Sequence, residues 1–96
     1  MSYRIVWSDF AKDDYAQILL FLQDKYSVNT ALAFLDKTEK IVEQITVFPL
    51  SFPVLEKNPR LHRAVINKNT SLLYRINQYE IELLFFQDNR MNDVDL

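Results

Sequence analysis

The chain has 96 residues, of which 49% are hydrophobic and 25% are charged, and its formal net charge at pH 7 is −2. We expect a single domain, 1–96, with one modest core, and the composition excludes an intrinsically disordered chain. The lack of cysteine excludes disulfides and thiolate metal sites, and no stretch reaches the ~20 apolar residues of a membrane span. We therefore expect a cytoplasmic protein with no membrane partner.

A short strand and a long helix are predicted at the start of the chain. Residues 3–7 are aromatic and β-branched, which is typical of a strand. Ser8 can cap the helix that follows, and apolar residues recur at helical spacing from about 9 to 26. Because residues 19–21 widen this apolar stripe, we expect the helix to be covered on two sides.

A second helix is predicted after a short link. Asn29 can act as its N-cap, an apolar stripe follows at helical spacing, and the helix should end before Pro49. The link is too short for anything but an antiparallel helical hairpin, and both apolar stripes need a sheet to pack on.

A proline-containing apolar loop follows the second helix at residues 48–55. Two prolines argue against a central strand. Phe52 and Leu55 either plug the end of the core or form part of an exposed groove for a partner segment.

The remainder, residues 61–90, predicts three short antiparallel strands. Apolar and polar residues alternate at 72–76 and again at 79–86. The joins at 67–70 and 77–78 are rich in asparagine, which tolerates a positive φ better than other non-glycine residues, so both predict hairpin turns. The order β-α-α-β-β-β gives one α+β domain, a helical hairpin packed on a small antiparallel sheet.

The basic residues are concentrated in the middle of the chain. Residues 1–55 hold five Lys or Arg and seven Asp or Glu, whereas residues 56–78 hold five Lys or Arg and one Glu. Such a patch can bind phosphate or an acidic peptide, or it can simply keep the sheet soluble. The net charge argues against nucleic-acid binding through bulk electrostatics alone.

Three arginines are the candidate anion-binding residues: Arg63, Arg75 and Arg90. Arginine presents a planar fork of donors that holds a phosphate or carboxylate, but whether these side chains share a face depends on strand register. A second interpretation is that Arg75 forms a cross-strand ion pair with Glu80 or Glu82.

Other chemistry finds little support in the sequence. His62 is the only histidine, and it is either an ordinary half-buried residue or a catalyst. Without glycine, phosphate-cradling loops are effectively excluded. We expect no cofactor and no metal.

Three segments in order resemble a known family. They read Ile-Val-Trp-Ser-Asp-Phe-Ala at 5–11, Leu-Tyr-Arg-Ile at 73–76 and Phe-Phe-Gln-Asp-Asn-Arg at 85–90. Together with the β-α-α-β-β-β order, they resemble the RelE/ParE toxin superfamily of bacterial type II toxin–antitoxin systems, and the resemblance covers nearly the whole chain. Arg63, Arg75 and Arg90 fall where this family tends to keep basic residues.

The resemblance implies a toxin that is neutralised by a cognate antitoxin. RelE-like members cleave messenger RNA on the ribosome, whereas ParE-like members inhibit DNA gyrase. The net acidic charge, and the lack of tyrosine and histidine from Gln87 to Leu96, make this chain closer to the ParE-like, plasmid-stabilisation branch. Whether it is an enzyme stays open.

Two alternatives to a gyrase inhibitor remain. One is a RelE-like mRNA endoribonuclease acting on the ribosome, with Arg63, Arg75 and His62 as its catalytic residues. The other is an inactive module that only binds the antitoxin.

Overall fold

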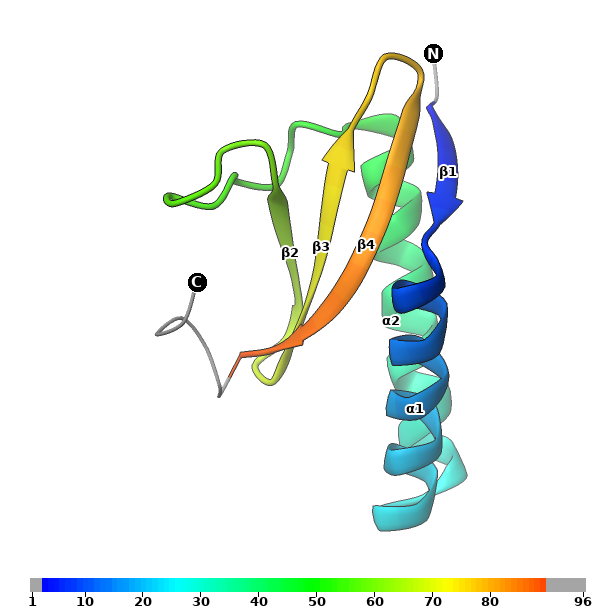
Figure 1. The fold of residues 1–96 in the computed structure, drawn as a ribbon. Helices are drawn as coiled ribbons and strands as arrows, with labels where there is room; N and C mark the ends of the chain where they lie inside the picture. The colour runs from blue at the N-terminus through cyan, green and yellow to red at the C-terminus, as the bar shows by residue number, and fades with distance from the viewer. Residues whose placement is uncertain (1–2, 90–96) are drawn as a thin grey trace.

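The computed structural model describes residues 3–89, whose elements follow the predicted order. They are β1 (Arg4–Trp7), α1 (Asp9–Lys25), α2 (Val28–Val47), β2 (His62–Asn67), β3 (Thr70–Ile76) and β4 (Glu80–Asp88). The two helices lie on one face of the sheet and extend past its end (Figure 1). Neither helix is both long enough and apolar enough to cross a membrane.

The sheet has four strands in the order β1-β4-β3-β2. The pairs β2–β3 and β3–β4 are antiparallel, as predicted, but β1 pairs parallel with β4, so the sheet is mixed. A parallel pair requires a long connection between its strands, and here both helices and two strands separate β1 from β4 (Figure 1). The predicted α+β class is confirmed.

Helix α1 begins where the sequence predicts. The Ser8 hydroxyl oxygen accepts a hydrogen bond from the Ala11 N–H at 3.0 Å, and the hydroxyl donates to the Leu84 carbonyl at 2.6 Å. The predicted cover on two sides is wrong within the described chain, because Leu20 and Phe21 are 60% and 52% exposed. The helix therefore presents apolar surface beyond the face that packs on the sheet.

Helix α2 begins two residues earlier than predicted. Its N-cap is Ser27, not Asn29, because Ser27 has extended backbone angles and its side chain accepts from the Thr30 N–H at 3.1 Å. The helix ends at Val47, before Pro49 as predicted.

Both predicted hairpin turns form, but not through positive φ. No residue in 3–89 has a positive φ. Instead, the Asn67 side-chain oxygen accepts hydrogen bonds from the N–H groups of Asn69 and Thr70, both at 2.9 Å. This Asx turn reverses the chain with ordinary backbone angles.

A β-bulge in β4 keeps its apolar residues in the core. Leu73 pairs with Phe85 and Tyr74 pairs with Leu83, so Leu84 has no partner on β3. Leu83 and Phe86 therefore both belong to the core cluster, although three positions separate them.

An aromatic cluster fills the space between helices and sheet. Tyr15 of α1 stacks on Trp7 and Phe86, with ring centroids 5.3 and 5.4 Å apart, and Phe34 of α2 lies beside it. On the β2 side, the Tyr74 hydroxyl donates to the Pro49 carbonyl at 2.6 Å. These contacts hold the first half of α1 and the segment after α2 against the sheet, while the other end of the helical pair extends past it (Figure 1).

The cap assignment can be tested with two substitutions. We expect Ser27→Ala to lower the free energy of unfolding by about 1 kcal/mol, because it removes the acceptor for the Thr30 N–H. Asn29→Ala, the matched control inside the helix, should change it by less than about 0.5 kcal/mol. Urea unfolding measures both, and a larger loss for Asn29→Ala would contradict the assignment.

Because its phenol is buried, Tyr74 should make the folded chain less stable at high pH. Burial raises the pKa of Tyr74 from 10.0 to about 12. Between these values the unfolded chain releases a proton that the folded chain keeps, so the free energy of unfolding should fall with a slope of up to ~1.4 kcal/mol per pH unit. Urea unfolding between pH 9 and pH 12 should show a shallower slope for Tyr74→Phe. Part of the slope should persist, because burial also raises the pKa of Tyr15. An unchanged slope would refute this role for Tyr74.

Candidate functional site

The strand register brings two of the three predicted arginines to one face. Arg63 lies opposite Leu73, and Arg75 follows Leu73 by two positions on β3. Residues two apart on a strand share a face, so Arg63 and Arg75 are diagonal neighbours, with Cα atoms roughly 7–8 Å apart. This face looks away from the helices, because the alternate residues Tyr74 and Ala64 belong to the core.

Arg75 is engaged by a carboxylate on the neighbouring strand. Its Nε and one terminal nitrogen donate to the same oxygen of Glu82, at 3.2 and 2.6 Å. The Asn77 side-chain amide also reaches this oxygen, at 3.5 Å. The predicted cross-strand ion pair therefore forms with Glu82, while Glu80 pairs with Arg4 at 2.7 Å.

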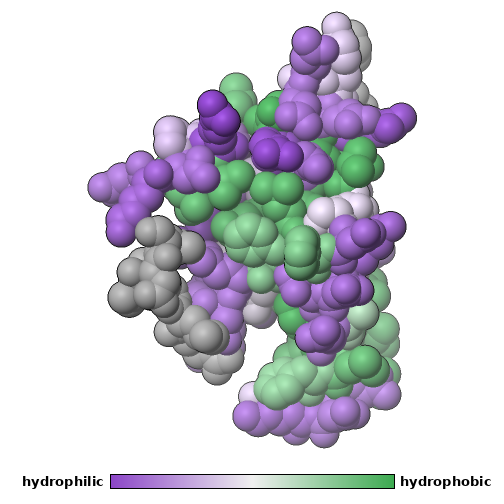
Figure 2. Space-filling model, viewed as in Figure 1, coloured by the Kyte–Doolittle hydropathy of each residue, from purple (hydrophilic) through white to green (hydrophobic). Residues whose placement is uncertain are grey.

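Arg63 has a different environment. It is half-buried, and no carboxylate of residues 3–89 forms an ion pair with it. Figure 2 shows an apolar area in the middle of this sheet face with polar residues around it. Val65, two positions from Arg63 on β2, is 53% exposed there. Arg63 thus offers its donors beside apolar surface, which strengthens electrostatic contacts with a partner.

Arg90, the third predicted arginine, lies outside the described residues. Its place relative to Arg63 and Arg75 therefore stays a prediction.

His62 lies on the opposite face from the arginines. Its ring is buried, stacks on Tyr74 with centroids 4.9 Å apart, and its Nδ1 is 2.8 Å from the Phe52 carbonyl oxygen. The side chain points toward the helices because it neighbours Arg63 on the same strand. The structure does not bring it to the arginines.

The proline-containing loop borders β2. Phe52 is half-buried and meets the Tyr74 ring edge-on at 6.4 Å, and the Leu55 N–H donates to the Leu61 carbonyl at 2.8 Å. Phe52 thus contributes to the core, the first of the two interpretations above. The loop exposes other apolar residues, Phe48 at 64% and Leu50 at 78%.

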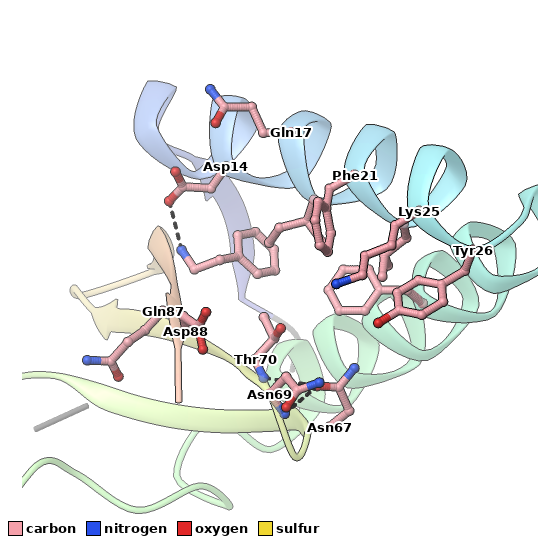
Figure 3. Close-up of a pocket in the computed structure, with 14 residues that line it drawn as sticks. Asp14, Gln17, Phe21, Lys25, Tyr26, Asn67, Asn69, Thr70, Gln87 and Asp88 are labelled. Carbon is pink, nitrogen blue, oxygen red and sulfur yellow. Dashed lines mark hydrogen bonds between the residues drawn. The ribbon is translucent and has the colours of Figure 1, made fainter. Parts of the chain in front are cut away.

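A cleft of about 410 Å³ lies between α1 and the β2–β3 turn. Figure 3 shows that α1 forms one wall, with the turn and the end of β4 opposite. The lining residues include an apolar group: Ile18, Phe21, Leu22, Phe34 and Phe86. The sequence did not predict this cleft, and its one signal was the apolar stripe widened by residues 19–21.

Charged side chains stand near the two ends of the cleft. Asp14 lies toward one end, where one of its carboxylate oxygens accepts a hydrogen bond from the Phe86 N–H at 3.0 Å (Figure 3). Lys25 lies toward the other, with its amine 5.5 Å from the Phe21 ring centre and 5.7 Å from that of Tyr26. Asp88 also lines the cleft.

Metal binding finds no support in this part of the chain. Within residues 3–89, no group of three or more His, Asp or Glu side chains is arranged to hold a metal ion.

Comparisons with known proteins rest on the fold. No family model matches the sequence, and no curated protein matches it. The structure of a chromosomal ParDE toxin–antitoxin system from P. aeruginosa matches 91% of this chain and 96% of its own, with a TM-score of 0.77 and 16% identity. A YoeB/ParE toxin from Agrobacterium tumefaciens matches 88% of this chain and 96% of its own, at TM-score 0.68 and 16% identity.

A toxin–antitoxin complex from E. coli, DinJ–YafQ, extends the comparison. It matches 95% of this chain and 97% of its own, with a TM-score of 0.64 and 10% identity. The chain therefore has the fold of the RelE/ParE toxin superfamily.

Proposed function

We propose that this chain is the toxin of a type II toxin–antitoxin system, that it inhibits DNA gyrase in the manner of ParE-like proteins, and that a cognate antitoxin neutralises it. The toxin fold supports the first part, and the similar structures are named as toxin–antitoxin systems or toxins. The separation of His62 from the arginines supports gyrase inhibition over RNA cleavage.

RNA cleavage needs a proton-transfer group beside the groups that hold the phosphate. His62 faces the core, where its ring stacks on Tyr74 and its Nδ1 contacts a backbone carbonyl. Burial raises the pKa of Tyr74 to about 12, so this phenol does not act as a base at neutral pH. Neither residue can work together with Arg63 on one phosphate.

A protein target suits the open sheet face better. Arginine is enriched in protein–protein interfaces and is often an energetic hot spot there, and apolar surface beside it can be buried in the same contact. Arg63 and Val65 provide this combination on β2. The net charge of −2 also disfavours binding to ribosomal RNA, whose phosphates attract basic proteins.

One observation favours the RelE-like alternative. Arg63 and Arg75 share the open face with Glu82, and a carboxylate can serve as a general base. In that case Glu82 would have to leave its ion pair with Arg75 to accept a proton from RNA. The third possibility, an inactive antitoxin-binding module, requires no chemistry on this face.

Controlled expression in bacteria without an antitoxin separates the three functions. We expect growth arrest with filamentous cells, an induced DNA-damage response and intact transcripts. Inhibition of gyrase blocks chromosome segregation, but it does not cleave RNA. Rapid transcript cleavage would instead favour the mRNA endoribonuclease. Normal growth despite soluble expression would favour the inactive module.

The arginines should differ in their effect on target inhibition. Arg63→Ala should weaken inhibition of purified gyrase by about tenfold or more, because Arg63 has no competing ion pair in residues 3–89. Arg75→Ala should have a smaller effect, since Nε and one terminal nitrogen of Arg75 already donate to Glu82. Arg90→Ala tests the remaining candidate.

Arg4→Ala is the matched control for these variants. Arg4 is exposed on β1 and paired with Glu80 of β4, so it lies on the same sheet face as Arg63 but at the opposite edge of the sheet. Equal losses for Arg4→Ala and Arg63→Ala would argue against the β2–β3 part of this face as the binding surface.

A further inference from the structure

The two arginines of the open sheet face differ in whether a carboxylate already binds them. Arg75 and Glu82 lie directly opposite each other on β3 and β4, and Nε and one terminal nitrogen of Arg75 donate to the same Glu82 oxygen. Arg63, the diagonal neighbour of Arg75 on β2, forms no ion pair within residues 3–89. Two of the three guanidinium nitrogens of Arg75 are therefore engaged before any ligand arrives.

Without Glu82, the two arginines would form a phosphate site. Diagonal neighbours on adjacent strands lie within reach of long side chains, so both guanidinium groups can approach one anion. Each guanidinium presents a planar fork of donors that matches the geometry of a phosphate. A phosphate at this place competes with the Glu82 carboxylate for Arg75, and the two negative charges repel each other.

Glu82 is held where it opposes a second anion. Its side chain is 29% exposed and that of Arg75 is 45% exposed, so solvent screens this pair less than it screens a fully exposed one. The Asn77 side-chain amide lies 3.5 Å from the same Glu82 oxygen and offers it a second donor. The carboxylate therefore has a fixed position beside Arg75.

The bulge in β4 contributes to this arrangement. Glu82 and Phe86 are four positions apart, so they would share a face in a regular strand. Because Leu84 has no partner on β3, Phe86 packs in the core while Glu82 stays opposite Arg75 on the open face. The strand thus completes the core and still presents a carboxylate to Arg75.

A second ion pair on the same face offers a comparison. Glu80 of β4 pairs with Arg4 of β1 at 2.7 Å, at the opposite edge of the sheet from Arg63. Neither β1 nor β4 carries another arginine. Removal of Glu80 therefore releases one arginine without creating a pair, whereas removal of Glu82 releases Arg75 beside Arg63.

We propose that Glu82 is a specificity-determining residue, which occupies Arg75 and adds negative charge so that the open face does not bind the phosphates of RNA. The face then remains available to a protein target. This inference deepens the proposed function, on which it rests for the identity of that target, by naming the residue that disfavours RNA. RNA binding is measured without gyrase, so the two proposals can fail independently.

Fluorescence anisotropy with a short labelled oligouridine tests this role. Glu82→Gln removes the charge but keeps an oxygen that accepts from Arg75, and Glu82→Ala removes both. The affinity for oligouridine should rise by about threefold in Glu82→Gln and by about tenfold in Glu82→Ala, because a charged donor pair becomes free for phosphate. In Glu82→Ala, the slope of log affinity against log salt concentration should steepen by about 0.7, the value for one further phosphate contact on a single strand.

The controls separate this site from net charge. Glu80→Gln and Glu80→Ala change the net charge by the same amount, but their affinity should stay within about twofold of wild type, because exposed single charges contribute little. Adding Arg75→Ala to Glu82→Ala should return the affinity to the wild-type value, and adding Arg63→Ala should remove most of the gain. Thermal unfolding establishes that each variant is folded, and Glu82→Gln decides the result if Glu82→Ala does not fold.

Three outcomes would overturn the proposal. They are Glu82 variants that bind oligouridine no better than wild type, Glu80 variants that gain as much, or a gain that persists without Arg75. Failure of the proposed function would appear separately, as gyrase that stays active in the presence of the wild-type chain, whatever the oligouridine binding shows.

Discussion

The helical pair covers only one face of the sheet, and the rest of the structure depends on this constraint. Each strand must place alternate residues in the core, so neighbours on one strand are separated into two environments. His62 becomes a buried residue stacked on Tyr74, while Arg63 next to it faces away from the helices. The bulge at Leu84 preserves the same division in β4 by returning Phe86 to the core.

The same packing creates two separate surfaces. The open sheet face carries Arg63 and the Arg75–Glu82 pair, and we assign the gyrase contact to it. Helix α1 extends beyond the strands (Figure 1), and Phe21 and Lys25 of this part of the helix line the cleft together with residues of the β2–β3 turn. In this account, the target meets the toxin on the sheet face that looks away from the helices.

Local patterns predicted most of the fold, because the periodicities of helices and strands can be recognised from residues a few positions apart in the sequence. Ser8 and the alternation at 72–76 are examples. The errors were also local: Ser27 and Asn29 are both good caps, and only the backbone angles decide between them. The asparagines at 67–70 were expected to adopt a positive φ, but the Asn67 side-chain oxygen instead accepts hydrogen bonds from the N–H groups of Asn69 and Thr70. To predict the shared face of Arg63 and Arg75, the strand register must be known, and to predict the cleft, the overhang of α1 must be known. Both depend on residues far apart in the sequence.

Inhibition of purified DNA gyrase is the most direct test of the central claim. Relaxed plasmid, gyrase and ATP are incubated with increasing amounts of the purified chain, and a translating extract with reporter transcript receives the same amounts. The account predicts dose-dependent loss of supercoiling with intact transcript. Undisturbed supercoiling together with cleaved transcript would contradict it and identify the RelE-like activity.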